Sequence, residues 1–248
     1  MSAPRLEVVD LSIGWDAAVL LRGISFQVER GAIFAILGGS GCGKSTLLRH
    51  LVGLDEPLSG RIAVDGVAPG PDASGRPRFG VTFQSGALLG SYTVAENVAL
   101  PLQTWTDLPL DAVGAIVAAK LRLVGLEQAG AQLPAELSGG MCKRAAIARA
   151  MALEPDLLFL DEPSAGLDPV TAAELDGLLQ QLNRQLGLTI VLVTHDLPSI
   201  LGIGSDCIML DRKSQAIIAR GDPRRLREAS EDPRVLAFFD RTPREVTP

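Results

Sequence analysis

The sequence lacks any apolar run long enough to cross a membrane. Its apolar stretches, such as residues 188–193, have the length of a strand, whereas a membrane-spanning helix needs about 20 apolar residues. Hydrophobic residues nevertheless make up 47% of the 248 residues, which is ample for a buried core. We therefore expect a protein that docks on an apolar partner and is not itself inserted in a bilayer.

Cysteine is scarce, and no long run of basic residues occurs. The three cysteines, Cys42, Cys142 and Cys207, are odd in number and form no CxxC pair, so neither a disulfide framework nor a zinc site is indicated. The N-terminus has no secretory hydrophobic segment, and we expect a cytosolic protein. The net charge of −6, without a basic stripe, argues against a nucleic-acid binder.

One glycine-rich stretch organises the chain. Gly38, four further residues and then Gly43-Lys44-Ser45 form the P-loop pattern, between an apolar strand-like run and a helix start. Backbone N–H groups of such a loop surround phosphate, while Lys44 would reach the β- and γ-phosphates and Ser45 would ligate Mg²⁺. A glycine-rich turn with a surface lysine is the simpler alternative. The predicted nucleotide-binding residues are Gly38, Gly39, Ser40, Gly41, Cys42, Gly43, Lys44, Ser45 and Thr46.

Strand and helix patterns alternate along the chain, which predicts an α/β fold. Residues 90–150 have mainly helical periodicity, and the segment from about residue 222 reads as a short helix plus a loose tail. The predicted strands are 6–11, 24–28, 33–37, 60–66 ending in an Asp-Gly turn, 79–83, 157–162 and 188–194, followed by a closing hairpin of 208–210 and 216–219.

Polar residues stand at the ends of three of these strands, where an α/β sheet binds its ligands. Asp161 could hold Mg²⁺ through water, and Glu162 could polarise a water for attack on the γ-phosphate. Gln84 could reach Mg²⁺ or the water, although a polar residue that starts a loop is an equally good interpretation. His195 could contact the γ-phosphate.

Two further features remain ambiguous on spacing alone. Ser138, Gly139 and Gly140 precede an alanine-rich helix, so they form either a second phosphate cradle or simply a helix start. Trp15, in a loop-like Gly-Trp-Asp before the P-loop, could stack on adenine or be an ordinary partly buried tryptophan.

Together these motifs resemble the ATPase subunit of ABC transporters over residues 5–221. The P-loop matches Walker A, residues 157–162 match Walker B with Glu162 as the catalytic glutamate, and residues 137–140 match the ABC signature Leu-Ser-Gly-Gly. Gln84 matches the Q-loop, Asp168 the D-loop and His195 the H-loop. Trp15 lies near the position of the family's adenine-stacking aromatic residue.

The resemblance implies a P-loop NTPase (RecA-like) core with an antiparallel β subdomain and a helical signature subdomain at about 86–150. It also implies ATP and Mg²⁺ as cofactors, with Ser45, Gln84 and Asp161 on the metal, Glu162 as general base and His195 on the γ-phosphate. A second copy would complete each ATP site, head to tail, through Ser138 and Gly140. The other partners would be transmembrane permease subunits at the cytoplasmic face of the inner membrane, reached through residues 86–105.

Within the family, the chain resembles the Mla-type, MCE-associated lipid transporters at residues 83–89, 97–102 and 232–240. It also resembles them at Met141, where most ABC ATPases have glutamine. This implies phospholipid transport with an MCE-domain lipid-binding protein, and a tail (222–248) that acts as a dimer clasp through 232–240. The alternatives are transport of an amino acid or lipoprotein, a non-transport ABC ATPase, and a small-molecule P-loop kinase.

Overall fold

The computed structural model describes residues 3–15, 18–70, 76–84 and 86–241. The chain forms two compact units. The first unit comprises Met1–Pro69 and Val191–Pro248, and the second comprises Gly70–Ile190. The sequence-based division into an ATPase domain of 1–221 and a tail of 222–248 stays a prediction, and the tail falls within the first of these units.

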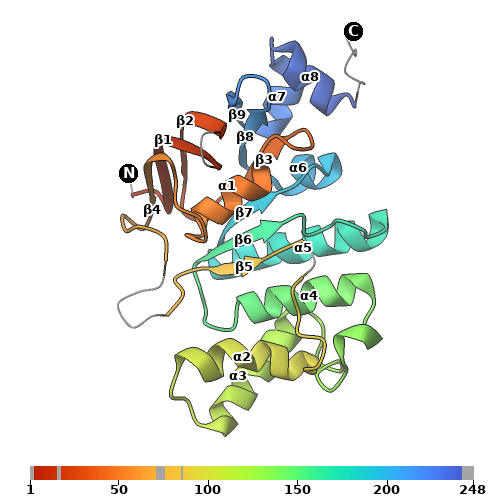
Figure 1. The fold of residues 1–248 in the computed structure, drawn as a ribbon. Helices are drawn as coiled ribbons and strands as arrows, with labels where there is room; N and C mark the ends of the chain where they lie inside the picture. The colour runs from red at the N-terminus through yellow and green to blue at the C-terminus, as the bar shows by residue number, and fades with distance from the viewer. Residues whose placement is uncertain (1–2, 16–17, 71–75, 85, 242–248) are drawn as a thin grey trace. The chain divides into compact units, whose positions relative to one another are not determined.

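Antiparallel pairing builds a three-stranded sheet in the first unit, with order β2-β1-β4 (Figure 1). The strands are β1 (Leu6–Trp15), β2 (Ala18–Val28) and β4 (Ser59–Val64). The Asp65-Gly66 turn that follows β4 has positive φ at both residues, 51° and 78°, as the sequence predicts for an Asp-Gly turn. This sheet is the expected antiparallel β subdomain.

The larger sheet has strand order β5-β6-β7-β3-β8-β9. Its strands are β3 (Ile33–Gly38), β5 (Gly80–Thr82), β6 (Leu157–Asp161), β7 (Thr189–Val193), β8 (Asp206–Asp211) and β9 (Ala216–Gly221). Every residue of β3, β6 and β7 is buried, which suits strands covered on both faces. The antiparallel β8–β9 pair is the predicted hairpin.

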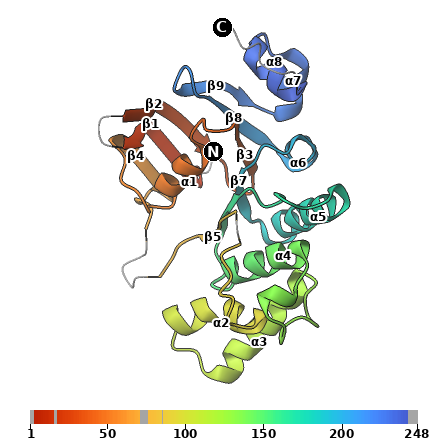
Figure 2. The ribbon, with the colours of Figure 1, turned by 45° about the vertical axis from the view of Figure 1, so that its right-hand side comes forward.

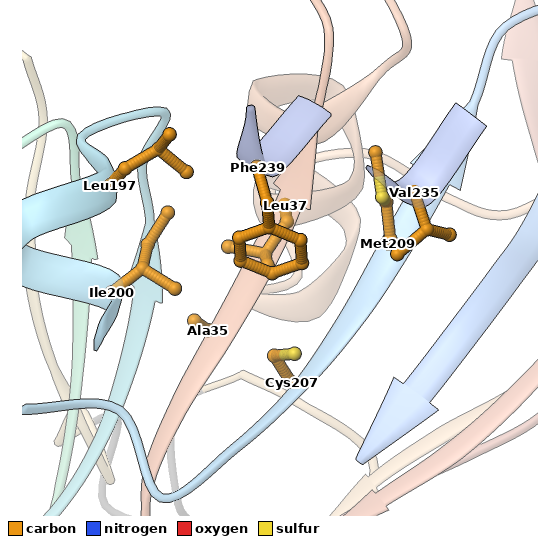
Figure 3. Packing of buried hydrophobic residues seen from close by; sticks show 8 residues of the cluster. All are labelled: Ala35, Leu37, Leu197, Ile200, Cys207, Met209, Val235 and Phe239. Atoms are coloured by element: carbon orange, nitrogen blue, oxygen red, sulfur yellow. The ribbon is translucent and has the colours of Figure 1, made fainter. Parts of the chain in front are cut away.

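The C-terminal segment is more ordered than the sequence predicts. Alongside α1 (Lys44–Leu51) and α6 (Leu197–Ile203), the first unit contains α7 (Pro223–Ala229) and α8 (Pro233–Phe239). Val235 and Phe239 of α8 are buried in a cluster with Leu37 of β3 and Met209 of β8, as Figure 3 shows. The predicted short helix after residue 222 is present as α7, whereas the prediction of a loose tail is wrong for residues 233–239, which form α8.

Helices dominate the second unit, as predicted for residues 90–150. They are α2 (Val94–Trp105), α3 (Leu110–Leu123), a short 3₁₀ helix η1 (Pro134–Glu136), α4 (Gly139–Ala150) and α5 (Pro169–Leu186). In Figures 1 and 2, α2, α3 and α4 lie side by side. Leu186, at the end of α5, is 53% exposed. In the described ranges, no helix is long and apolar enough to span a membrane.

Candidate active site

The P-loop joins β3 to α1 in the first unit, and its glycines are required by the geometry. Gly38, Gly41 and Gly43 have φ values of 144°, 71° and 102°, which side-chain-bearing residues rarely adopt. A Cβ on Gly38 would lie 2.6 Å from both Cys42 Sγ and the Leu210 carbonyl oxygen. Ser40, Gly41 and Ser45 are exposed, so the loop presents its polar atoms outward, as a phosphate cradle must.

Positive charge is built into the P-loop. Lys44 is buried, and its Nζ donates hydrogen bonds to the carbonyl oxygens of Gly38 (2.9 Å) and Gly39 (3.2 Å). The first turn of α1 contains no acidic residue, so no carboxylate of that turn offsets the positive helix N-terminus. Burial raises the pKa of the Cys42 thiol, partly opposed by the Lys44 charge. Cys42 is therefore a small packing residue of the loop.

Trp15 ends β1, whereas the sequence placed it in a loop. It pairs with Ala18 across the β1–β2 hairpin, and its side chain is 57% exposed. Leu20 of the same hairpin lies against the P-loop, because a Cβ on Gly43 would be 2.8 Å from its Cδ2. The exposed indole thus stands on the hairpin that contacts the phosphate loop, which is a suitable place for stacking on a base.

His195 follows β7, and the structure places it in the first unit. The side chain is exposed. The backbone behind it is fixed, because the Asp196 N–H donates to the buried Thr194 hydroxyl at 3.1 Å. In the strand order, β7 is the hydrogen-bonded neighbour of β3, the strand that leads into the P-loop.

In the second unit, parallel pairing brings the Q-loop glutamine beside the catalytic-glutamate candidate. Strand β5 pairs with β6 in parallel, with Thr82 opposite Leu160. Gln84 and Glu162 each come shortly after one of these paired strands ends, at the carboxyl edge at which α/β sheets bind ligands. Asp161 and Glu162 are both buried, with 6% and 9% exposure.

The backbone of Glu162 has an unusual conformation. Its φ is +47°, a left-handed value that costs a residue with a side chain about 1 kcal/mol or more. Its carbonyl oxygen accepts a hydrogen bond from the Ala165 N–H at 3.1 Å. Backbone strain of this kind concentrates at functional sites, and here it turns the chain directly after the Walker B strand.

The signature residues pack against the start of α5. Ser138 caps α4, with its hydroxyl accepting a hydrogen bond from the Met141 N–H at 3.3 Å. A Cβ on Gly139 would lie 3.4 Å from Leu167, and one on Gly140 would lie 2.5 Å from Thr171 Cγ2. Glycine at position 140 is therefore required by this packing, independently of any ligand.

Asp168, the D-loop candidate, is the N-cap of α5. Its carboxylate accepts hydrogen bonds from the Val170 and Thr171 N–H groups and from the Thr171 hydroxyl. These bonds, the Thr171 hydroxyl foremost, hold the pKa of Asp168 below its ordinary value of 3.8. In the structure the Asp168 side chain caps the N-terminus of α5. Thr171 bonds to this carboxylate and also lies against Gly140, so Thr171 links the cap to the signature residues.

Two cations on α4 were missed by the sequence reasoning. Lys143 and Arg149 donate to main-chain carbonyl oxygens of the segment that follows β5. No residue pattern identifies such a contact in advance, because the acceptor is backbone and carries no sequence signal.

The comparisons with known proteins fit this geometry. The family described as "ABC transporter" matches residues 21–165 of the 248. The chain belongs to the ABC transporter family.

Within the ABC transporter family, the chain is similar to ATP-binding proteins of two kinds of transport system. The chain is 44% identical over 244 residues to the intermembrane phospholipid transport system ATP-binding protein MlaF of Escherichia coli K12, covering 96% of this chain and 89% of MlaF. It is 43% identical over 213 residues to the methionine import ATP-binding protein MetN of Rhizobium meliloti, covering 84% of this chain but only 59% of MetN.

Solved structures agree with this family. The CbiO1 subunit of a Clostridium perfringens ABC transporter complex superposes with a TM-score of 0.83 at 32% identity, over 93% of each chain. The ATP-binding cassette MJ0796, dimeric and bound to ADP and phosphate after hydrolysis, superposes with a TM-score of 0.77 at 28% identity, over 88% of this chain and 98% of its own. The predicted fold class is confirmed, and the chain is an ABC-type ATPase.

As an ABC ATPase, the chain divides its candidate residues between the two units. The first unit holds Trp15, His195 and the P-loop, residues 38–46. The second unit holds Gln84, Asp161, Glu162, Asp168 and the signature, residues 138–140. Within each unit the structure brings the candidates onto neighbouring elements, with Leu20 joining Trp15 to the P-loop and Thr171 joining the signature to Asp168.

Proposed function

We propose that this ABC ATPase powers the transport of phospholipid between membranes. The supporting observation is the 44% identity to MlaF across 96% of the chain, which extends beyond residues 21–165 that match the general family. Met141, directly after the signature glycines, and the segment 232–240 are the sequence features that resemble the lipid-transport group. The MlaF likeness also includes most of the relative's own length.

The contacts in each unit support a division of roles. Lys44 and the P-loop N–H groups bind the phosphates, and Trp15 stacks on the adenine. Glu162 acts as the general base on the attacking water, and Gln84 orients that water because it follows the neighbouring parallel strand. His195 contacts the γ-phosphate from the end of β7.

The oxygen donors of Ser45, Gln84 and Asp161 suit Mg²⁺, which prefers hard ligands and retains several waters beside the substrate phosphates. Among the described residues, no group of three or more His, Cys, Asp or Glu side chains could hold a metal by itself. Mg²⁺ would neutralise the charge that develops on the phosphates, and this chain would supply few of its ligands.

A second copy completes the proposed site. The MJ0796 cassette is dimeric, and in the head-to-tail arrangement Ser138, Gly139, Gly140 and the Asp168 turn of one chain face the nucleotide of the other. The remaining proposed partners are permease subunits at the cytoplasmic face of the inner membrane and an MCE-domain lipid-binding protein.

The experiment that tests this function is a tagged pull-down from membranes of the Glu162→Gln variant, which retains ATP. Partners and bound lipid are identified by mass spectrometry. Phospholipid together with a permease and an MCE-domain protein is the expected result. A permease with a solute-binding protein instead would overturn the phospholipid proposal and favour the amino-acid importer suggested by the MetN likeness.

The tail offers a separate test of assembly. Deleting residues 232–248 would expose the core that Val235 and Phe239 fill. A loss of dimer formation in that variant would therefore not be distinguishable from a loss of stability. Leu236 lies on α8 outside that cluster. If residues 232–240 clasp a neighbouring subunit, Leu236→Ser should reduce recovery of the dimeric complex while leaving the Tm of the isolated chain within about 2 °C. Undiminished assembly would refute the clasp.

A further inference from the structure

Lys143 connects three parts of the hydrolysis machinery. It lies on α4, five residues after Ser138 of the signature. Its Nζ donates a hydrogen bond to the carbonyl oxygen of Gln84 at 2.5 Å and a longer one to the carbonyl oxygen of Glu162 at 3.4 Å. One ammonium group therefore links the backbones of the Q-loop glutamine and the proposed general base, and all three residues belong to the second unit.

Partial burial of the Lys143 ammonium group costs free energy, because the charge loses part of its hydration. Lys143 is half-buried, and desolvation lowers its pKa, opposed by the negative charges of Asp161 and Glu162. A lysine on a helix surface ordinarily extends into water. Here it turns inward to main-chain oxygens, where charge-assisted bonds are stronger than neutral ones.

The backbone segments that Lys143 links include residues with positive φ. Glu162 has a φ of +47°, and the chain after Gln84 passes through positive φ at Gly86 (73°) and Ala87 (48°). Arg149, six residues further along α4, donates to the carbonyl oxygens of Gly86 and Ala87 at 3.1 and 2.7 Å. Arg149 thus bonds to the Q-loop segment, whereas Lys143 bonds both to that segment and to Glu162.

We propose that Lys143 is a positioning residue for ATP hydrolysis. By fixing the carbonyl groups of Gln84 and Glu162 to one point on α4, it keeps the amide of one and the carboxylate of the other directed at the same water. The same contact ties this pair to the helix that begins at the signature. Because its hydrogen bonds go to main-chain oxygens of Gln84 and Glu162 and not to the P-loop, we expect its loss to lower turnover more than ATP affinity. This inference rests on the proposed role of Glu162.

The test compares Lys143→Met, Lys143→Arg and Lys120→Met in the purified full-length protein with the partners it retains. Lys120 is a matched control, since its ammonium group is largely buried in an ion pair with Glu154 (3.0 Å) away from the site. Lys143→Met should lower kcat by about tenfold or more, as small misplacements of catalytic groups do, with KM for ATP within about twofold. Lys143→Arg, which can donate to both carbonyls, should restore most of kcat, and Lys120→Met should match the wild type.

Epistasis with Glu162 separates positioning from general damage. In a Glu162→Gln background, adding Lys143→Met should lower the residual rate by much less than in the wild-type background, because one of the two groups that Lys143 positions is already disabled. An unchanged kcat in Lys143→Met, a parallel loss of ATP affinity, or a failure of arginine to rescue would each overturn the proposal. Retention of hydrolysis by Glu162→Gln would instead overturn the general-base assignment, so the two failures are distinguishable.

Discussion

The P-loop of the first unit and the Q-loop of the second are both held by cations, but with different partners. Lys44 bonds to carbonyl oxygens of its own loop, Gly38 and Gly39, whereas the Q-loop carbonyls are held by Lys143 and Arg149 from a separate helix. The P-loop is thus held mainly by bonds within the loop, although Leu210 and Leu20 pack against its glycines. The Q-loop depends on tertiary contacts, so its position follows that of α4.

The largest effect is expected where glycine geometry matters most. In Gly38→Ala, the new methyl group would collide with the Leu210 carbonyl and with Cys42, and we expect ATP affinity to fall by about a hundredfold or more. The measurement is nucleotide binding by calorimetry.

Gly221→Ala is the matched control for that variant. Its φ of +136° is close to the +144° of Gly38, but no atom lies within 4 Å of its Cβ position. It should lose about 1 kcal/mol of stability and retain ATP affinity. Equal losses of affinity in the two variants would show that backbone strain, and not the collision, explains the requirement for glycine.

An intermediate effect is expected in the second unit at Gly140. In Gly140→Ala the methyl group would lie 2.5 Å from Thr171 Cγ2, and we expect kcat to fall by about tenfold as the signature shifts. Adding Thr171→Ser removes that Cγ2 and keeps the hydroxyl that bonds to Asp168, so it should recover much of the rate. If steady-state kinetics show no recovery, the glycine is required for a reason other than this packing.

The smallest effect is expected at the α5 cap. Because the folded-state pKa of Asp168 is depressed, its charge stabilises the protein fully above the ordinary pKa of 3.8, and this stability is lost as the pH falls through the lowered value. Asp168→Asn should therefore lower the Tm by roughly 2 °C near neutral pH. The difference should vanish in strongly acidic solution, and a Tm difference independent of pH would contradict the assignment to charge.

Local patterns predicted the fold well where neighbours in sequence determine the conformation. The P-loop, the Asp65-Gly66 turn and the Ser138 cap were all predicted correctly. The packing of α8 was missed because Val235 and Phe239 become buried only once β3 and β8 are in place, although the Asp-Pro pairs that cap α7 and α8 were a usable signal. The burial of Cys42 and the strained φ of Glu162 likewise depend on tertiary contacts.

The central claim is that the P-loop unit binds ATP and the unit containing Glu162 hydrolyses it. The most direct measurement is the ATP dissociation constant and the hydrolysis rate of Lys44→Ala and Glu162→Gln, both side by side with the wild type. The account predicts that Lys44→Ala loses affinity by about a hundredfold, while Glu162→Gln binds ATP as tightly as the wild type and hydrolyses it at least about a hundredfold more slowly. Normal hydrolysis by Glu162→Gln, or an equal loss of affinity in both variants, would contradict it.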